Sequence, residues 1–301
     1  MGPEPFVAST FDLDIVNEAS GVASSLRNPT TLYVLDDGPG STGVLAIDVM
    51  TGDATTLIVD GLNGRDTEGL AVGACTAWGT TRRRGSRPTC LFIGDIGNNQ
   101  EAWESIDVWR VREPDLRDAP STLTVAGDVA TYTYPYGPVD AEALLVERGR
   151  PFLITKERPN PDTSRVRKPR LLAARRFADG QLRNLGAIPL PEPEAGGWAA
   201  AFYGNVATGG ELAGGRVVLR TYDHVLVYTA DTENAPLRTL ARWTPREIDT
   251  PQLPQGEAVT MNDCGVWLVS EGTDSVWLVP LPRRGFDNAQ EQACPNGSAH
   301  S

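Results

Sequence analysis

The sequence predicts an all-β chain that forms a single β-propeller, and three observations support this class. The 301 residues include 31 Gly and 23 Pro, a composition typical of many tight turns. A hydrophobic content of 40% is enough for a substantial core. One pattern of short strands recurs five times, and each copy begins with an acidic or small polar residue followed by an apolar run.

Each copy of the repeat contains three strands that are easily recognised. The first strands are expected at 18–24, 68–72, 142–146, 210–214 and 257–261. The second strands are expected at 31–37, 90–99, 151–157, 217–223 and 266–272. The third strands are expected at 43–49, 106–111, 170–177, 224–230 and 275–281. Sandwiches and barrels also contain short strands, but they do not require the same polar residue before each first strand.

Fourth strands are weaker and follow only the first four copies. They are expected at 54–60, 129–135, 183–189 and 238–244. The fifth copy has none downstream, so we expect 6–16 to supply it and close the ring, as propellers commonly do. Five blades are favoured, and a sixth could lie between Ala187 and Asn205. The prediction is one domain over 1–301, with a C-terminal tail, 283–301, tied by Cys294.

The chain has four cysteines, and none has the Cys-x-x-Cys spacing of zinc or redox sites. We expect two disulfides, Cys75 with Cys90 and Cys264 with Cys294. Disulfides indicate an oxidising compartment, so the predicted location is extracellular or the cell envelope. The first residues show neither the charged nor the apolar region of a signal peptide, so this expectation depends on the cysteines alone.

Charge and composition disfavour several classes of function. The net charge is −12, which would repel nucleic-acid phosphates and anionic lipids, so no nucleic-acid partner is expected. No apolar run is long enough to span a membrane. The only histidines are His224 and His300, which disfavours a Ser-His-Asp triad and a histidine-rich zinc site.

Blade geometry brings polar residues together at one end of the channel. In a four-stranded blade the start of the first strand and the end of the second lie at the same end. The expected inner ring is Glu18, Glu68, Glu142 and Glu257, with Glu211 less securely aligned. The expected second layer includes Asp36, Asp37, Asp95, Asn98, Asn99, Lys156, Glu157, Arg220, Tyr222, Asp223 and Glu271. Aligning the small residues places Ser20 opposite Glu68, and Gly210 in the matching position of the fourth copy.

Converging carboxylates repel one another unless a positive charge compensates them. Lys156 and Arg220 could do so, or a Ca²⁺ ion, which binds oxygen ligands of this kind. The expected calcium ligands are Glu18, Glu68, Asp95, Glu142 and Glu257. The segment 94–99, "GDIGNN", fits an oxygen-rich turn, although Asp and Asn beside Gly are also ordinary turn residues.

The segments "NEASGVA", "RDTEGLAV", "GDIGNN", "VREP", "RTYD" and "SEG" resemble a group of exported bacterial β-propeller proteins, common in actinobacteria and largely uncharacterised. More distantly, the chain is similar to two other groups of propellers, the phytase-like propellers and the esterase-like-activity-of-phytase propellers. That resemblance implies calcium and acidic residues at one end of the channel. It transfers no catalytic residue to this sequence.

Two functions are expected, and both use the same end of the channel. The first is a calcium-dependent hydrolase of a phosphoester, glycoside or ester. Its expected catalytic residues are Glu68 or Glu257 as base, with Lys156 and Arg220 stabilising negative charge. Its expected substrate contacts are Asp37, Asn98, Asn99, Tyr222 and Glu271. The alternative is a non-catalytic module that binds a carbohydrate, a peptide or an envelope partner.

Overall fold

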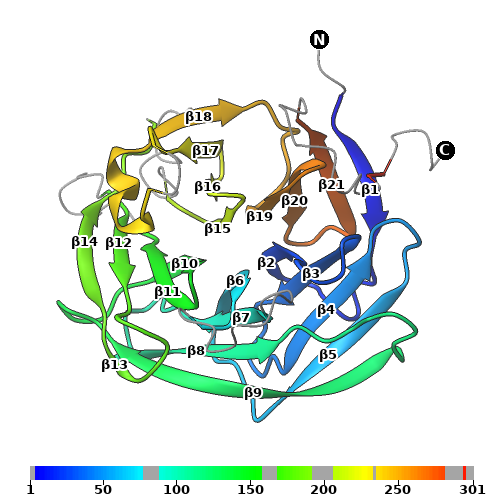
Figure 1. Cartoon of the computed structure of the whole chain (residues 1–301), viewed down its shortest axis with the longest axis horizontal. Helices are drawn as coiled ribbons and strands as arrows, with labels where there is room; N and C mark the ends of the chain where they lie inside the picture. Colours follow the sequence, from blue (N-terminus) through cyan, green and yellow to red (C-terminus); the bar gives the residue numbers. More distant parts are fainter. Residues whose placement is uncertain are drawn as a thin grey trace.

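The protein is a β-propeller, as the sequence predicts. The computed structural model describes residues 4–76, 88–157, 168–191, 206–232, 235–281 and 294–295. Their strands form four sheets arranged radially about a central axis (Figure 1). Three sheets have four strands, and the nine-stranded sheet joins two antiparallel four-stranded units through β5 and β9, so the described strands are grouped here into five blades. Residues 192–205, in the stretch where the sequence left room for a sixth blade, lie outside the described part of the chain.

The blades follow one another along the chain, and each is written here from its inner to its outer strand. Blade 1 contains β2 (Ala19–Ser24), β3 (Thr31–Asp36), β4 (Gly43–Asp48) and β5 (Ala54–Asp60). Blade 2 contains β6 (Thr67–Ala74), β7 (Thr89–Asp95), β8 (Ser105–Arg112) and β9 (Thr122–Thr133). Blade 3 contains β10 (Ala141–Glu147), β11 (Arg150–Thr155), β12 (Arg170–Ala173) and β14 (Arg183–Ala187). Blade 4 contains β15 (Gly209–Ala213), β16 (Arg216–Arg220), β17 (Val225–Thr229) and β18 (Thr244–Ile248). Blade 5 contains β19 (Gly256–Asn262), β20 (Gly265–Ser270), β21 (Ser275–Pro280) and β1 (Phe6–Thr10).

The N-terminal strand completes the last blade, which confirms the predicted ring closure. Strand β1 pairs antiparallel with β21, with Phe6 opposite Leu278 and Thr10 opposite Ser275. Blade 5 therefore combines residues from both ends of the propeller. This pairing covers an edge of β21 that would otherwise be open.

Five apolar clusters lie between adjacent blades and hold the ring together. Their formation follows from the alternation of side chains along each strand. On β11, Phe152 and Ile154 pack with Val217 of blade 4, whereas Leu153 packs with Phe92 of blade 2. Each blade therefore buries both faces, which explains why the strands have continuous apolar runs rather than one polar face.

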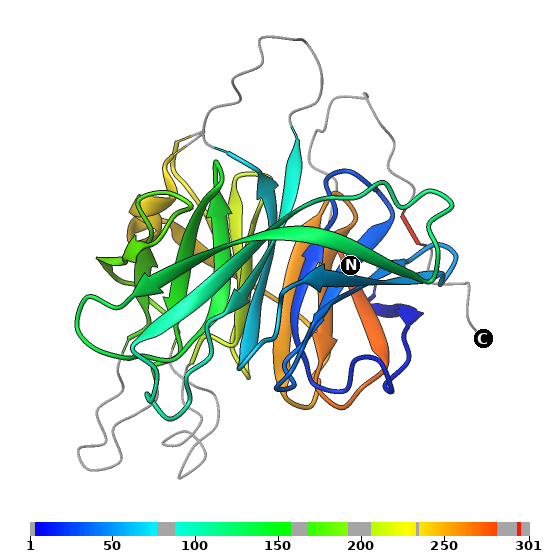
Figure 2. The same ribbon diagram turned by 90° about the horizontal axis from the view of Figure 1, so that it is seen from below.

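The outer strand of blade 2 joins three blades. Strand β9 is 12 residues long, and its first part pairs parallel with β5 of blade 1. Its second part pairs antiparallel with β8, and its end pairs with β13 (Gly180–Gln181), in the connection between β12 and β14. Figure 2 shows this strand crossing the outside of the ring. The fourth strand expected at 129–135 thus begins earlier than predicted.

The fourth strand of blade 4 was wrongly predicted at 238–244. This segment contains a 3-10 helix, η1 (Leu237–Arg242), and the strand that pairs with β17 is β18. Leu237 and Leu240 are both fully buried, and their spacing of three residues matches one turn of a 3-10 helix.

Both predicted disulfides are present. Cys75, just after β6, is bonded to Cys90 in β7, and Cys264 is bonded to Cys294. Apart from 294–295, the tail from residue 282 onward lies outside the described residues. In the described part of the chain no helix has both the length and the hydropathy needed to cross a membrane.

Candidate metal centre at the channel mouth

Four inner strands begin with a β-bulge, where one strand has an extra residue. In β6, Thr67 pairs with Asp95 and Gly69 pairs with Gly94, so Glu68 has no partner on β7. The equivalent extra residues are Ser20 in β2, Glu142 in β10 and Glu257 in β19. A bulge re-aims its extra side chain away from the regular alternation of the strand. The repeat thus turns three glutamates toward one end of the channel.

The ammonium group of Lys156 interacts with all three glutamates. It lowers the pKa of Glu68, Glu142 and Glu257, so all three carboxyl groups lie close enough to interact with it. We call this end of the channel, lined by Glu68, Glu142, Glu257 and the residues around them, the channel mouth.

Hydroxyl groups take the equivalent position in the other two blades. Ser20 Oγ donates a hydrogen bond to the Thr67 carbonyl at 2.7 Å. Thr208 Oγ1 donates to the Gly256 carbonyl at the same distance. The alignment of Ser20 agrees with the sequence prediction, but in blade 4 the position belongs to Thr208 rather than Gly210, because β15 has no bulge.

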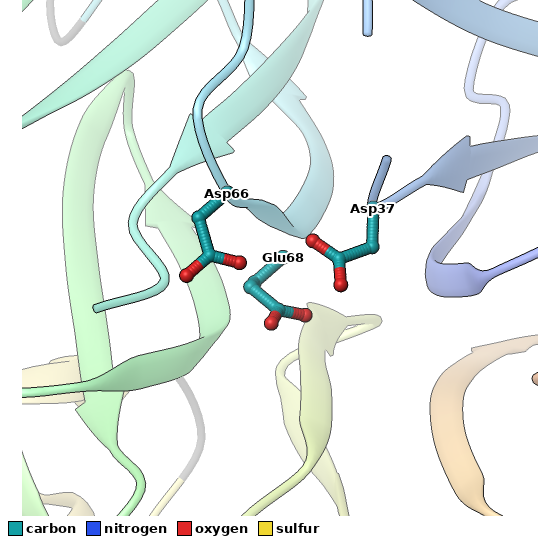
Figure 3. A group of neighbouring side chains, drawn as sticks. All are labelled: Asp37, Asp66 and Glu68. Atoms are coloured by element: carbon teal, nitrogen blue, oxygen red, sulfur yellow. The ribbon is translucent and has the colours of Figure 1, made fainter. Parts of the chain in front are cut away.

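Three carboxylates come together between blades 1 and 2 (Figure 3). Asp37 follows β3, Asp66 immediately precedes β6, and Glu68 is the second residue of β6. One oxygen from each lies within 4.8 Å of the others. Asp37 and Asp66 are within hydrogen-bonding reach of one another. We call these three residues the acidic trio.

The trio has few protein partners. Glu68 is only 4% exposed, and among the described residues no donor makes a hydrogen bond to its carboxylate. Asp37 Oδ1 is also buried and accepts no hydrogen bond from the described part of the chain. Buried polar atoms are normally bonded, so Glu68 and Asp37 Oδ1 are exceptions to that rule.

Burial and repulsion from neighbouring acids disfavour ionisation of Asp37 and Glu68. Burial raises the pKa of Asp37 to about 8, with further contributions from Asp66 and Glu257. Burial also raises the pKa of Glu68 well above its ordinary value, and the charges of Glu142 and Asp37 add to this effect. A bound cation would reverse this preference, because it stabilises the charged carboxylates.

Asp95, expected as a calcium ligand, instead holds the loop that carries the trio. Its Oδ1 accepts hydrogen bonds from the backbone N–H groups of Arg65 and Asp66 at 2.9 and 2.8 Å. Its Oδ2 accepts one from Arg65 Nε at 3.0 Å. Asp36, the equivalent residue of blade 1, likewise accepts from the backbone N–H groups of 17–18. Both Asp95 oxygens accept hydrogen bonds within the protein, and its role as a calcium ligand stays a prediction.

Glu142 and Lys156 form a buried ion pair beside the trio. The Lys156 ammonium donates to Glu142 Oε1 and lies 5.5 Å from the ring centroid of Tyr222. Burial alone would lower the pKa of Lys156, but the charges of Glu142, Tyr222 and Glu68 outweigh it and raise the pKa. Lys156 is therefore a protonated partner of Glu142 rather than a free substrate ligand.

Three partly exposed glutamates surround the trio and the ion pair. Burial raises the pKa of Glu257 to about 7. Glu18 interacts electrostatically with Asp37 and Glu257, so its carboxylate faces the same opening. Glu271 also acts on Glu257, and its Oε2 accepts a hydrogen bond from the side chain of Gln255.

Arg220, predicted as a catalytic cation, forms hydrogen bonds that join two blades. It is 4% exposed, and its Nη1 donates to the carbonyls of Ala258 and Val269 at 3.0 and 2.9 Å. Its Nη2 lies 3.3 Å from Ser270 Oγ. Gly256 leaves room for the guanidinium, because a Cβ atom there would overlap it. The donors of Arg220 are thus used between β16, β19 and β20.

Asn98 and Asn99 do not form the oxygen-rich ligand turn that their spacing suggested. Asn98 is 1% exposed, and its Oδ1 accepts from the backbone N–H groups of Ala102 and Trp103 at 2.8 and 3.2 Å. Its Nδ2 donates to the Trp103 carbonyl at 3.0 Å. Asn98, predicted as a substrate contact, bonds within its own loop, and Asn99 is exposed.

Glu211 lies deeper in the channel than the glutamates of the mouth. Its Oε1 accepts from the backbone N–H of Val72 on β6 at 3.1 Å, and its Oε2 accepts from Thr260 Oγ1 on β19. The backbone N–H of Ser24 on β2 also bonds to it. Burial raises the pKa of Glu211 to about 8, although these donors act against the increase. One side chain from blade 4 therefore reaches three other inner strands.

Sequence reasoning missed two acids, Asp66 and Asp140. Each lies two residues before a bulged glutamate, in the triplets "DTE" (66–68) and "DAE" (140–142). Asp66 completes the trio, and Asp140 Oδ1 accepts from the backbone N–H of Asn98 at 2.9 Å. The repeated Asp-x-Glu spacing is the signal that would have found both.

Comparison with known proteins supports the fold and assigns no family. No protein-family model and no curated protein sequence matches the chain. Among solved structures, the chain is similar to the major allergen Mala s 1 of Malassezia sympodialis, with TM-score 0.52 and 9% identity over 96% of this chain and 100% of that one. It also matches a luciferin-regenerating enzyme, with TM-score 0.45 and 10% identity over 95% and 98% of the two chains. At such identities the likeness shows the propeller fold alone.

Proposed function

We propose that the channel mouth binds a divalent cation, and that Asp37, Asp66 and Glu68 hold it. The observation that carries this proposal is the trio itself: three converging carboxylates, one of them 4% exposed without a hydrogen-bond donor among the described residues. All the ligand atoms are carboxylate oxygens, which suits a hard cation such as Ca²⁺ and not Zn²⁺. The sequence resemblance to phytase-like propellers also favours calcium.

We further propose that the site belongs to a metal-dependent hydrolase. A bound divalent ion supplies polarisation of a substrate oxygen and a lower pKa for an attacking water. Glu257 is partly exposed at the same opening and has a pKa of about 7, which suits a group that accepts a proton near neutral pH. Glu68 then holds the ion, Glu257 serves as the base, and Lys156 positions Glu142 beside them.

A calcium titration followed by thermal melting tests the ion site. A ligand that binds only the folded state raises the melting temperature. We expect calcium to raise it for the wild type but not for Glu68→Gln, which keeps the size of the side chain and removes its charge. Glu211→Gln is the matched control, because it changes a second buried glutamate of the channel and should respond like the wild type. An equal response of wild type and Glu68→Gln would contradict the proposed ligand set.

A specific observation favours a second candidate, a cation-dependent binding module. Both cations expected to stabilise a transition state are committed elsewhere, Lys156 to Glu142 and Arg220 to backbone carbonyls. A site without a free cation is poorer in catalytic groups than the sequence suggested.

Turnover separates the two candidates. A panel of chromogenic acyl esters, glycosides and phosphoesters would be tested with and without calcium. The hydrolase predicts calcium-dependent turnover that falls at least about tenfold in Glu257→Gln while calcium binding persists. Calcium binding without any turnover would favour the binding module.

We propose that the protein works outside the cytoplasm. Cys75–Cys90 and Cys264–Cys294 are both bonded, and disulfides of this kind persist in oxidising compartments. Fractionation of cells that express the complete gene would test this location, and recovery in the cytosol with free thiols would contradict it.

A further inference from the structure

The channel mouth remains negatively charged even when it holds a divalent cation. The three ionised carboxylates of the trio carry one more charge than such an ion neutralises. Glu257, the bulged residue of β19, and Glu18, whose carbonyl accepts from the backbone N–H of Asp37 at 2.8 Å, add two more carboxyl groups to the mouth. A ligand entering this opening therefore meets an excess of negative charge.

The described cations around the mouth offset only part of this excess. The charge of Arg220 acts on Glu257, whereas Lys156 and Arg65 are paired with acids of their own. Lys156 is paired with Glu142. Arg220 donates to backbone carbonyls of β19 and β20. Arg65 Nε is paired with Asp95 Oδ2, and Arg65 Nη2 lies 3.7 Å from Asp107 Oδ2. None of these three offers a free donor fork of the kind that binds phosphate.

We propose that the ligand of this site is an uncharged, hydroxyl-rich molecule of the sugar class, and not a phosphoester. This inference rests on the proposed function, since it assumes that a cation is held by the trio. A hydroxyl group suits the two features of the opening at once, because its lone pair can bind a cation while its proton bonds to a carboxylate. Glu18 and Glu257 are the carboxylates that would accept such protons.

A phosphoester lacks this complementarity. Its oxygens would bind the ion, but they cannot donate to Glu18 or Glu257, and their charge would be repelled by both. A cationic ligand would be attracted, yet it would compete with the ion for the same carboxylates. The negative charge of the channel mouth therefore favours a neutral sugar over a phosphoester or a cationic ligand.

A glycan array on the calcium-loaded protein tests the ligand class directly. It would carry neutral glycans, the same glycans bearing phosphate, and the same glycans bearing an amine. We expect calcium-dependent binding of neutral members, at least about tenfold tighter than their phosphorylated counterparts. Tighter binding of phosphorylated members, displacement of calcium by the amines, or no glycan binding at all would each overturn the inference.

Two variants and a calcium titration separate the test of the ligand class from the test of the ion site. Glu18→Gln should narrow the preference for neutral over phosphorylated members by about threefold, because it removes one rim charge. Asp53→Asn, an exposed position outside the mouth, should leave the preference unchanged. Calorimetric titration with calcium alone is run on the same preparation. Failure to bind calcium would overturn the proposed function, whereas calcium binding with a preference for phosphate would overturn only the ligand class.

Discussion

Glu68 and Glu211 lie in the same channel and share the same burial, yet they have opposite surroundings. They are 4% and 2% exposed, and burial raises the pKa of both. Glu211 accepts hydrogen bonds from Val72 and Thr260, so the protein satisfies it. Glu68 has the acids Asp37 and Asp66 as its neighbours and, among described residues, no donor.

The different surroundings of Glu68 and Glu211 distinguish a functional acid from a structural one. A buried carboxylate with donors contributes to stability, and removing it leaves those donors unsatisfied. A buried carboxylate without donors costs stability until a cation binds. Burial and a raised pKa alone do not separate the two cases.

Substitution of Glu211 and Glu68 should differ most in its effect on the free energy of unfolding measured without calcium. We expect Glu211→Ala to lower the free energy of unfolding by about 3 kcal/mol, because it leaves buried donors on β6 and β19 unsatisfied. We expect Glu68→Ala to change it by no more than about 1 kcal/mol, since no hydrogen bond is lost. Denaturant unfolding of both variants measures this, and equal losses would remove the basis of the comparison.

Arg220 provides the next test, because the structure assigns it to the blade interface. We expect Arg220→Met to lower the free energy of unfolding by about 2 kcal/mol, through lost hydrogen bonds to the carbonyls of Ala258 and Val269. The affinity for calcium should stay within about threefold of the wild type. Loss of calcium binding at unchanged stability would restore a role for Arg220 in the site.

The pH dependence of calcium binding should follow the raised pKa values of the mouth. Asp37 and Glu257 have pKa values of about 8 and about 7, above their ordinary values of 3.8 and 4.5. In the absence of the ion, their contribution to stability is therefore full below about pH 4 and is lost as the pH rises through 7 and 8.

Calcium must displace the proton of Asp37, so its affinity should rise about tenfold between about pH 6 and pH 8. Calorimetric titrations at both ends of this range measure the change. An affinity that does not vary with pH would show that protons and calcium do not compete for the trio.

Asp95 should have the smallest effect, because it acts on the trio only through the loop that it holds. Asp95→Asn keeps an acceptor for the backbone N–H groups of Arg65 and Asp66 but weakens the pairing with the Arg65 guanidinium. We expect calcium affinity to fall by about threefold. A loss as large as that of Glu68→Gln would make Asp95 a direct ligand.

The repeat in the sequence was sufficient to predict the fold and the convergence of acids. Side-chain alternation and acid-led first strands are local patterns, so the propeller class and the closing strand β1 could be predicted from them. The positions of the four cysteines predicted both disulfides. The strand predicted at 238–244 was wrong because Leu237 and Leu240 are three residues apart, a spacing that favours a 3-10 turn over a strand.

The division of roles among the converging acids could not be predicted. Whether an acid is free or committed depends on donors from distant segments, such as the Arg65 backbone that occupies Asp95. For the same reason Asn98 and Arg220 have the right residue types at the right end of the propeller, yet their polar atoms are used by the fold. Asp66 was overlooked because it precedes the strand rather than beginning it.

The most direct test of the cation site is crystallographic. Crystals of the protein would be grown with calcium, terbium would be exchanged for it, and the anomalous signal of the terbium would be measured. We predict one strong peak bonded to carboxylate oxygens of Asp37, Asp66 and Glu68, and no such peak in Glu68→Gln. A channel mouth without a peak in the wild type, or a peak bound only by other residues, would contradict the claim that the trio is a cation site.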